Sequence, residues 1–298
     1  MCIVIGKIDK CYSRPPIRGR KAISLGIRLK YDEDMKIAIT GKGGVGKTTL
    51  TALLAQTYAD QNRDVLAVDA DPSPCLAGAL GFPNELRTKL HPIAEMDELI
   101  EERTGAKPGT VGGFFTLNPR VDDIPERFSV LHRGVRLLEM GSVDMGGSGC
   151  ICPESAMLKT LFTHLLFRKD DILLLDMYAG VEHLGRATVD FVDAMLIVVE
   201  PTRRSLGTAA QIKKLANDIG LTRLYLVGNK VRNDEEAKFL EDETSGLPPL
   251  GVLPADLKVQ EADRLNIPVY DHVEGLKVSA QQIINKLDKL IDNEGMKT

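Results

Sequence analysis

One short stretch, residues 41–49, restricts what this chain can fold into more than any other feature of its 298 residues. It reads Gly-Lys-Gly-Gly-Val-Gly-Lys-Thr-Thr, follows the apolar run at 36–40, and precedes apolar residues at helical spacing. Such an order of strand, glycine-rich loop and helix suits an anion, because glycines let backbone N–H groups crowd around a phosphate and the helix adds its positive dipole end. The stretch therefore predicts a P-loop within an α/β fold.

The predicted P-loop lets us expect a role for several of its residues. We expect Lys47 to reach the β and γ phosphates as a point charge, and the Thr48 hydroxyl to complete the coordination of a Mg²⁺ ion. The alternative is a glycine-rich turn that binds no nucleotide, but it leaves the flanking strand and helix without a reason. The residues expected to contact the nucleotide here are Gly43, Gly44, Val45, Gly46, Lys47, Thr48 and Thr49.

The composition favours one large domain that dissolves in water. Its 43% hydrophobic content can supply a large core, and the chain has no apolar run near the ~20 residues of a membrane span. The net charge is -4, and no concentrated field of Lys and Arg predicts binding to nucleic acid or to a membrane. We therefore expect a cytoplasmic protein.

The first 34 residues differ from the rest. Residues 1–34 carry eight Lys and Arg against four Asp and Glu, whereas the whole chain is acidic. They show no helical or strand period, and no apolar stretch typical of a signal peptide. We expect a loosely structured extension there and the nucleotide-binding domain at 35–298. The alternative is that translation begins at Met35, directly before the first predicted strand.

Local spacing predicts further elements. Buried strands are expected at 64–69 and 170–176, and the second has the Walker B pattern, so Asp176 is an expected ligand of the Mg²⁺ shell. Apolar residues at helical spacing predict one helix through 85–103 and a last helix at 276–291. The other strands that we expect are 128–131 and 135–140, as a pair, then 194–200 and 223–227.

The second informative stretch is Cys150-Ile151-Cys152. Five cysteines, an odd number without framework spacing, favour reduced thiols or a metal site over disulfides. In extended backbone Cys150 and Cys152 point the same way with Cα atoms about 6.6 Å apart, near the upper limit for a disulfide. Pro153 suits the first turn of a helix, where the thiol pKa is lowered. We expect Cys75 to be a small packed residue, and assign no role to the cysteines at positions 2 and 11.

A metal site built on this pair needs further ligands, because one pair supplies only two thiolates. A closed tetrahedral site takes four ligands, so two pairs that meet across a dimer axis would complete it. The alternatives are that Cys150 and Cys152 are buried small hydrophobes, or that they form a redox pair.

A second lysine, Lys42, stands directly after the first glycine of the loop. In this position it resembles the deviant P-loop of the family that includes nitrogenase iron protein, MinD, ParA and CooC. The strings Gly-Cys-x-Cys-Pro-Glu at 149–154 and Asp-x-x-Ala-Gly-x-Glu-His-Leu-Gly-Arg at 176–186 narrow the resemblance to CooC-type nickel-insertion ATPases, which mature carbon monoxide dehydrogenase. The similarity covers roughly residues 35–290.

This resemblance implies a three-layer α/β domain, with a mostly parallel central sheet and helices on both faces. It implies that ATP closes a homodimer in which Lys42 of one protomer contacts the γ phosphate bound by the other. By the same resemblance Asp71 orients the attacking water, and Asp69 holds the first switch near Mg²⁺. The catalytic set would then be Lys42, Lys47 and Asp71, with a second switch at Ala179 and Gly180.

The resemblance also implies a base site, a cargo and a client. Asn229 would read the adenine edge, and the backbone around Pro254 would line the adenine pocket. The dimer would carry Ni²⁺, or Zn²⁺ in its place, on Cys150 and Cys152. The client would be carbon monoxide dehydrogenase or, in a close variant, acetyl-CoA synthase.

Two other functions stay open at this point. The first is an iron-sulfur cluster scaffold or carrier ATPase, although such relatives place their cysteines as Cys-x-x-Cys or as two distant singles. The second is a positioning ATPase of the ParA or MinD type, which neither a basic surface nor a basic terminal helix supports.

Overall fold

The computed structural model describes residues 34–109, 114–141, 152–168, 171–178, 191–244 and 246–295, with the side chains of 292–295 left out. The predicted extension, except Asp34, therefore lies outside the described residues. No helix within these ranges combines the length and the apolar character needed to cross a membrane.

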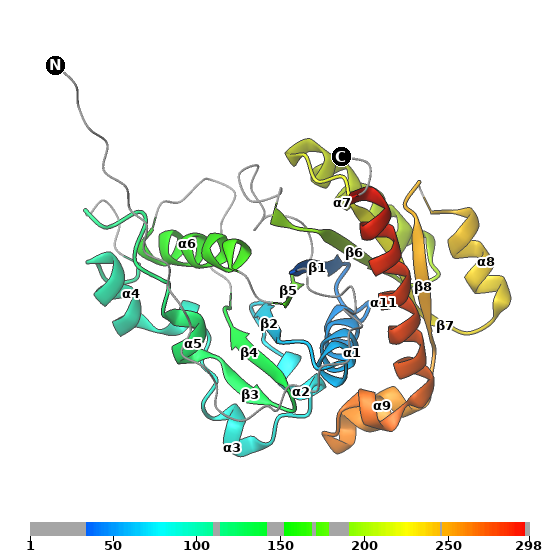
Figure 1. Ribbon diagram of the computed structural model, residues 1–298, viewed down its shortest axis with the longest axis horizontal. Coiled ribbons are helices and arrows are strands. Elements are labelled where there is room, and N and C mark those ends of the chain that lie inside the picture. Colours follow the sequence, from blue (N-terminus) through cyan, green and yellow to red (C-terminus); the bar gives the residue numbers. More distant parts are fainter. Residues whose placement is uncertain are drawn as a thin grey trace, which may run out of the picture. The chain divides into compact units, whose positions relative to one another are not determined.

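The described strands form one sheet of eight, in the order β3-β4-β2-β5-β1-β6-β7-β8 (Figure 1). Neighbouring strands are parallel throughout, except for the antiparallel pair β3 and β4. The strands are β1 (Met35–Gly41), β2 (Val65–Ala70), β3 (Val130–His132), β4 (Val135–Glu139), β5 (Ile172–Met177), β6 (Ala194–Val199), β7 (Leu224–Val231) and β8 (Pro249–Pro254).

Helices connect these strands and cover the sheet. The described helices are α1 (Lys47–Asp60), α2 (Leu76–Ala79), α3 (Asn84–Arg87), α4 (Asp97–Thr104), α5 (Ile124–Phe128), α6 (Pro153–Phe167), α7 (Arg203–Ile219), α8 (Asp234–Asp242), α9 (Leu257–Leu265), α10 (Val269–His272) and α11 (Glu274–Gly295), with the 3-10 helix η1 (Ile93–Glu95).

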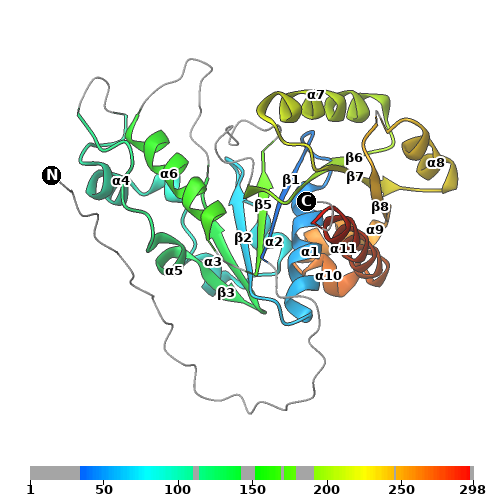
Figure 2. The same cartoon turned by 45° about the horizontal axis from the view of Figure 1, so that its top comes forward.

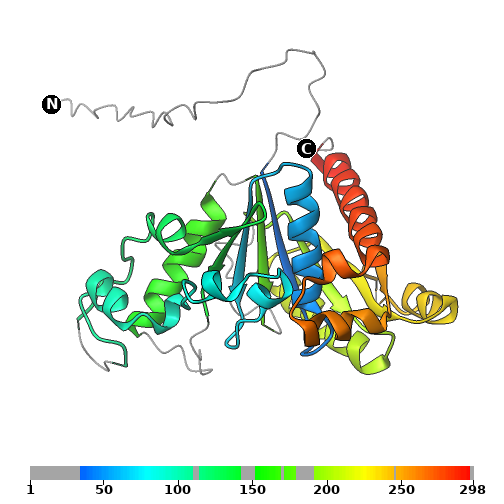
Figure 3. The same cartoon turned by 90° about the horizontal axis from the view of Figure 1, so that it is seen from below.

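Two hydrophobic cores lie on opposite faces of the sheet because side chains alternate along each strand. In β1, Ile37 and Ile39 join the core under α1, α2, α10 and α11, whereas Ala38 joins the core under α4 to α8. In Figure 3 α1 (blue) and α11 (red) lie side by side on the first face, and in Figure 2 α7 covers β6 on the second. The predicted three-layer α/β fold with a mostly parallel sheet is confirmed.

The predicted strands and the last helix are confirmed within four residues at each end, whereas the helix predicted at 85–103 is wrong. The single helix predicted at 85–103 is divided into α3, η1 and α4. Pro92 lies in this break, and a proline inside a helix removes a hydrogen bond and clashes with the preceding turn. The strand predicted at 128–131 begins only at Val130, because Phe128 is the last residue of α5.

Candidate nucleotide site

The P-loop leaves the carboxyl end of β1 in the middle of the sheet and enters α1 at Lys47. At two of its glycines, Gly41 and Gly46, any other residue would clash with a neighbouring strand. A Cβ atom on Gly41 would lie 2.4 Å from the Val198 carbonyl oxygen of β6, and one on Gly46 would lie 2.1 Å from Nδ2 of Asn229. Gly46 also has a φ of 97°, in the left-handed region that glycine adopts without strain. The loop is thus wrapped closely against the neighbouring strands.

The two lysines of the loop lie in different surroundings. Lys47 is only 8% exposed, and its ammonium donates to the Lys42 carbonyl oxygen at 3.4 Å, so it is folded back over the loop. The side chain of Lys42 is exposed. A buried cation in the cradle suits a bound phosphate, whereas an exposed one is accessible to a second molecule. Their catalytic roles stay predictions.

Asp176 is the second-last residue of the neighbouring strand β5 and pairs in register with Ile39 of β1, just before this loop. It is 1% exposed, and neither carboxylate oxygen has a hydrogen-bond partner. Burial raises the pKa of Asp176 to about 7, and the charge of Asp69 acts in the same direction, whereas the nearby Thr48 hydroxyl and the charge of Lys47 oppose it. A buried, unpaired carboxylate calls for a cation. With the hydroxyl of Thr48 it offers the oxygen ligands that Mg²⁺ prefers, so the residues present fit this ion.

Asp69 lies opposite Asp176 in the register of β2 and β5. Its buried carboxylate accepts three backbone N–H groups, from Asp71 at 3.1 Å, Cys75 at 2.9 Å and Leu76 at 2.9 Å. Burial raises the pKa of Asp69, although these hydrogen bonds act in the opposite direction. Asp69 therefore fastens the loop that carries Asp71 to the end of β2, and a direct contact with Mg²⁺ stays a prediction.

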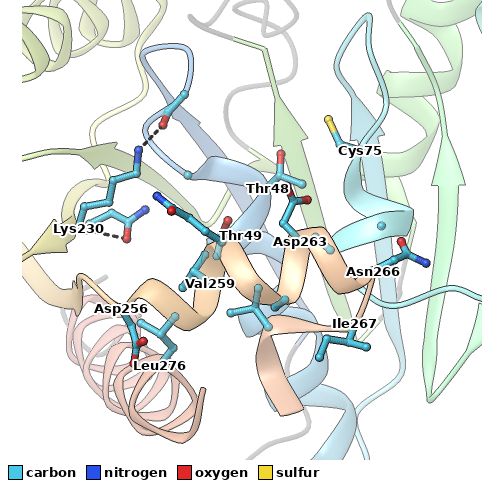
Figure 4. A pocket seen from close by; sticks show the side chains of 18 of the residues that line it. Thr48, Thr49, Cys75, Lys230, Asp256, Val259, Asp263, Asn266, Ile267 and Leu276 are labelled. Atoms are coloured by element: carbon cyan, nitrogen blue, oxygen red, sulfur yellow. Dashed lines mark hydrogen bonds between the residues drawn. The ribbon is translucent and has the colours of Figure 1, made fainter. Parts of the chain in front are cut away.

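A pocket of about 990 Å³ opens at this carboxyl edge of the sheet (Figure 4). It is lined by the P-loop, by the loop before α2, by the ends of β7 and β8, and by α9. Four of the predicted nucleotide contacts, Gly44, Gly46, Thr48 and Thr49, line it together with Asn229 and Pro254. Val45 instead packs its side chain into the core.

The base-site residue Asn229 is already engaged by the protein. Its Nδ2 donates to the Val45 carbonyl oxygen at 2.7 Å, and its Oδ1 accepts the N–H of Lys230 at 2.8 Å. Each amide atom keeps one further hydrogen-bonding site, so recognition of the adenine edge stays a prediction. Asn229 lies inside β7, whereas the sequence predicted it after a strand at 223–227, and Pro254 is the last residue of β8.

Three residues of the pocket were missed or misread from the sequence. Cys75, predicted as packed, is exposed at the rim, where partial desolvation and the charges of nearby Asp69 and Asp71 raise its pKa. Glu139, at the end of β4, is half buried, which raises its pKa to about 7. Lys230 contacts the P-loop directly. The only sequence signal for these residues was their place at or next to strand ends.

Cys152 is the described member of the cysteine pair. It is the N-cap residue of α6, in extended backbone, with its Sγ 3.1 Å from the Ser155 hydroxyl oxygen. Since β4 and β5 both run parallel to β2, α6 between them begins at the carboxyl edge, the same edge as the P-loop. Cys150, Ala179 and Gly180 lie outside the described residues. Within the described ranges no three or more His, Cys, Asp or Glu side chains are grouped to hold a metal.

Comparison with known proteins shows the family to which this chain is similar. The model of the CobQ/CobB/MinD/ParA nucleotide binding domain matches residues 36–269. The carbon monoxide dehydrogenase accessory protein CooC of Rhodospirillum rubrum is 48% identical over 80% of this chain and 90% of its own. An uncharacterised ATP-binding protein of Methanocaldococcus jannaschii is 45% identical over 86% of this chain and 98% of its own.

Solved structures share the fold. The MinD cell division protein of Aquifex aeolicus has a TM-score of 0.59 and 24% identity, over 87% of this chain and 97% of that one. A plasmid partition protein of Borrelia burgdorferi bound to AMPPNP has a TM-score of 0.60 and 15% identity, over 86% and 99%. At these identities the similarity concerns the fold alone.

Proposed function

Because this chain belongs to the CobQ/CobB/MinD/ParA nucleotide-binding family and is CooC-like within it, we propose that it is an ATP-hydrolysing, dimerising metallochaperone. Its cargo is nickel, and its client is the active-site cluster of carbon monoxide dehydrogenase. The observation that carries the proposal is the similarity to CooC, which extends over nearly the whole of that protein. The P-loop, the two lysines and the thiol at the start of α6 supply the chemistry.

ATP hydrolysis is assigned to the residues around the P-loop. Lys47 and the N-terminus of α1 hold the phosphates. Thr48 and Asp176 would hold Mg²⁺, which when bound would supply positive charge against the phosphates. Asp71 orients the attacking water, and Asp69 keeps the loop of Asp71 at the end of β2. Catalysis is then mainly positioning and charge stabilisation.

Dimerisation is assigned to Lys42. A triphosphate is strongly anionic, and an exposed cation on the loop of one protomer can approach the γ phosphate held by the other. ATP thereby joins the two protomers, and hydrolysis loosens them.

Nickel binding is assigned to the thiols of Cys150 and Cys152. A helix N-terminus favours the thiolate, which is the form that binds a soft metal, and Cys152 occupies that position on α6. Two protomers bring four sulfurs to one ion. Since α6 and the P-loop begin at the same edge of the sheet, nucleotide state and metal binding can be linked through the dimer.

The test is an anaerobic Ni²⁺ titration of the full chain with Mg²⁺ and a non-hydrolysable ATP analogue. We expect the wild type to bind one ion per dimer, and Cys152→Ser to lower the affinity more than about 100-fold, because a ligand is lost. Cys75→Ser is the matched control, since Cys75 is the other described free thiol, and it should bind as the wild type does. Equal nickel affinity in Cys152→Ser and wild type would refute the assignment.

The client is tested separately. Apo-forms of carbon monoxide dehydrogenase and acetyl-CoA synthase are incubated with the nickel-loaded protein and ATP, and recovered activity is measured. We expect the dehydrogenase to be activated faster than by free Ni²⁺ at the same concentration. Faster activation of the synthase alone would assign the protein to that client instead.

A further inference from the structure

Lys230 of β7 reaches across to the P-loop. Its ammonium donates to the Gly44 carbonyl oxygen at 2.8 Å and pairs with the carboxylate of Glu200, which follows β6. The neighbouring Asn229 holds the next carbonyl of the same loop, that of Val45. Two consecutive side chains of one strand thus hold two consecutive peptides of the loop.

This arrangement needs an unusual backbone. Consecutive side chains of a regular strand point to opposite faces, so Asn229 and Lys230 could not both reach the loop. Here the register between β7 and β8 shifts between Gly228 and Val231, and Lys230 has a φ of 57°, in the left-handed region that lysine seldom adopts. The irregular backbone turns both side chains toward the P-loop, where Figure 4 shows Lys230 beside the pocket.

Holding the two carbonyls also orients the phosphate-binding groups. In a trans peptide the C=O and the following N–H point in opposite directions. With the carbonyls of Gly44 and Val45 directed to β7, the N–H groups of Val45 and Gly46 point away from it. The N–H of Val45 donates across the loop to the Lys42 carbonyl oxygen at 3.4 Å.

We propose that Lys230 is a positioning residue of the nucleotide site, which holds the empty P-loop in the shape that receives the phosphates. Its side chain is 52% exposed, and an exposed ion pair adds little to the stability of a fold. The contact therefore serves the loop more than the domain. The proposal rests on nucleotide binding, the first part of the proposed function, and does not involve nickel.

The experiment measures binding of a fluorescent ADP analogue by stopped flow, with Mg²⁺ and without nickel, to the full chain. Lys230→Met should lower the association rate constant about tenfold, as expected for a lost hydrogen bond from a charged donor, and change dissociation less. Lys230→Arg keeps a cationic donor and should recover most of the rate. The matched control is Lys258→Met, an exposed lysine of α9, which should bind at the wild-type rate.

Each possible result of this experiment either supports the proposed role of Lys230 or overturns it. Wild-type association in Lys230→Met overturns the proposal, and so does faster dissociation alone, which would mean that Lys230 contacts the ligand and not the empty loop. Should Lys230→Met fail to fold, Glu200→Gln loosens the ammonium and must slow association if the proposal holds. A wild type that binds no nucleotide refutes the ATP part of the proposed function as well, so the two failures are told apart.

Discussion

At the scale of single residues, Asp176 has the least favourable surroundings of the site. Its carboxylate is buried without a hydrogen-bond partner near Asp69, and its pKa is raised to about 7. Because this native value lies above the unfolded one, the native state binds more protons between about pH 4 and pH 7. Stability supplied by this group therefore falls as the pH rises through that interval, and is lowest above it.

The first prediction follows from this pH dependence of the stability supplied by Asp176. In the absence of Mg²⁺, Asp176→Asn should stabilise the protein, and the gain should grow from pH 4 to pH 7 and level off above, reaching about 1–3 kcal/mol. Urea unfolding at several pH values measures it. Asp242→Asn, on the exposed side of α8, is the control without such a gain. A gain that does not vary with pH would contradict this account of Asp176.

The same variant should separate stability from function. Asp176→Asn removes an anionic oxygen from the expected Mg²⁺ site, so nucleotide affinity should lose its dependence on Mg²⁺. In the wild type, that dependence should weaken as the pH falls below about 7, because protons then compete for Asp176. Nucleotide binding with and without Mg²⁺ at pH 6 and pH 8 checks both points.

At the scale of elements, the short helix α2 depends on one carboxylate. Asp69 accepts the N–H groups of Cys75 and Leu76, and α2 begins at Leu76. A four-residue helix has little stability of its own, so this anchor and its packing on α1 hold it in place. The loop that carries Asp71 lies between the anchor and the helix.

We therefore predict that Asp69→Ala opens this element locally. Hydrogen exchange of the backbone amides that Asp69 accepts, those of Asp71, Cys75 and Leu76, should accelerate at least about tenfold, since a buried hydrogen bond contributes about 1 kcal/mol or more. Asp193→Ala is the matched control, because the Asp193 carboxylate accepts the N–H of Lys36 at the amino end of the sheet. It should affect exchange at 36 and leave 71–76 unchanged. Unchanged exchange at 71–76 in Asp69→Ala would contradict the anchor.

How far the elements could be predicted from the sequence depended on their neighbours. Strands β1, β2, β5 and β6 are buried on both faces, so they appear in the sequence as continuous apolar runs. Residues 85–103 kept helical spacing across a break, because that spacing describes burial and not hydrogen bonding. The prediction for Cys75 was wrong because exposure at a pocket rim depends on tertiary packing.

For the candidate site too, contacts between residues that are close in sequence could be predicted, and contacts between distant residues could not. The place of Asp176 in a buried strand beside β1 was predictable because its strand and motif are local features. The contact of Lys230 with Gly44 joins residues 186 positions apart and depends on an irregular strand and a positive φ, neither of which has a local signature here. Such contacts can be recognised only in the folded structure.

At the scale of the whole molecule, the parallel sheet brings distant residues to one edge. The P-loop, Asp69, Asp176 and the N-terminus of α6 all lie at the carboxyl ends of strands, and Lys42 is exposed on the same loop. In the function proposed above, one protomer supplies a phosphate cradle, an accessible lysine and two of the four metal-binding thiols. Two protomers closed by ATP would complete both the catalytic and the metal sites.

The central claim is that ATP assembles a dimer which holds one nickel ion between its protomers. Light scattering during gel filtration, with metal analysis of the peak, tests it in anaerobic Ni²⁺, Mg²⁺ and a non-hydrolysable ATP analogue. We predict a wild-type dimer with one nickel per two chains, and a Lys42→Ala variant that stays monomeric and loses most of the metal. A nucleotide-loaded wild type that is monomeric, with each chain binding its own nickel, would contradict it.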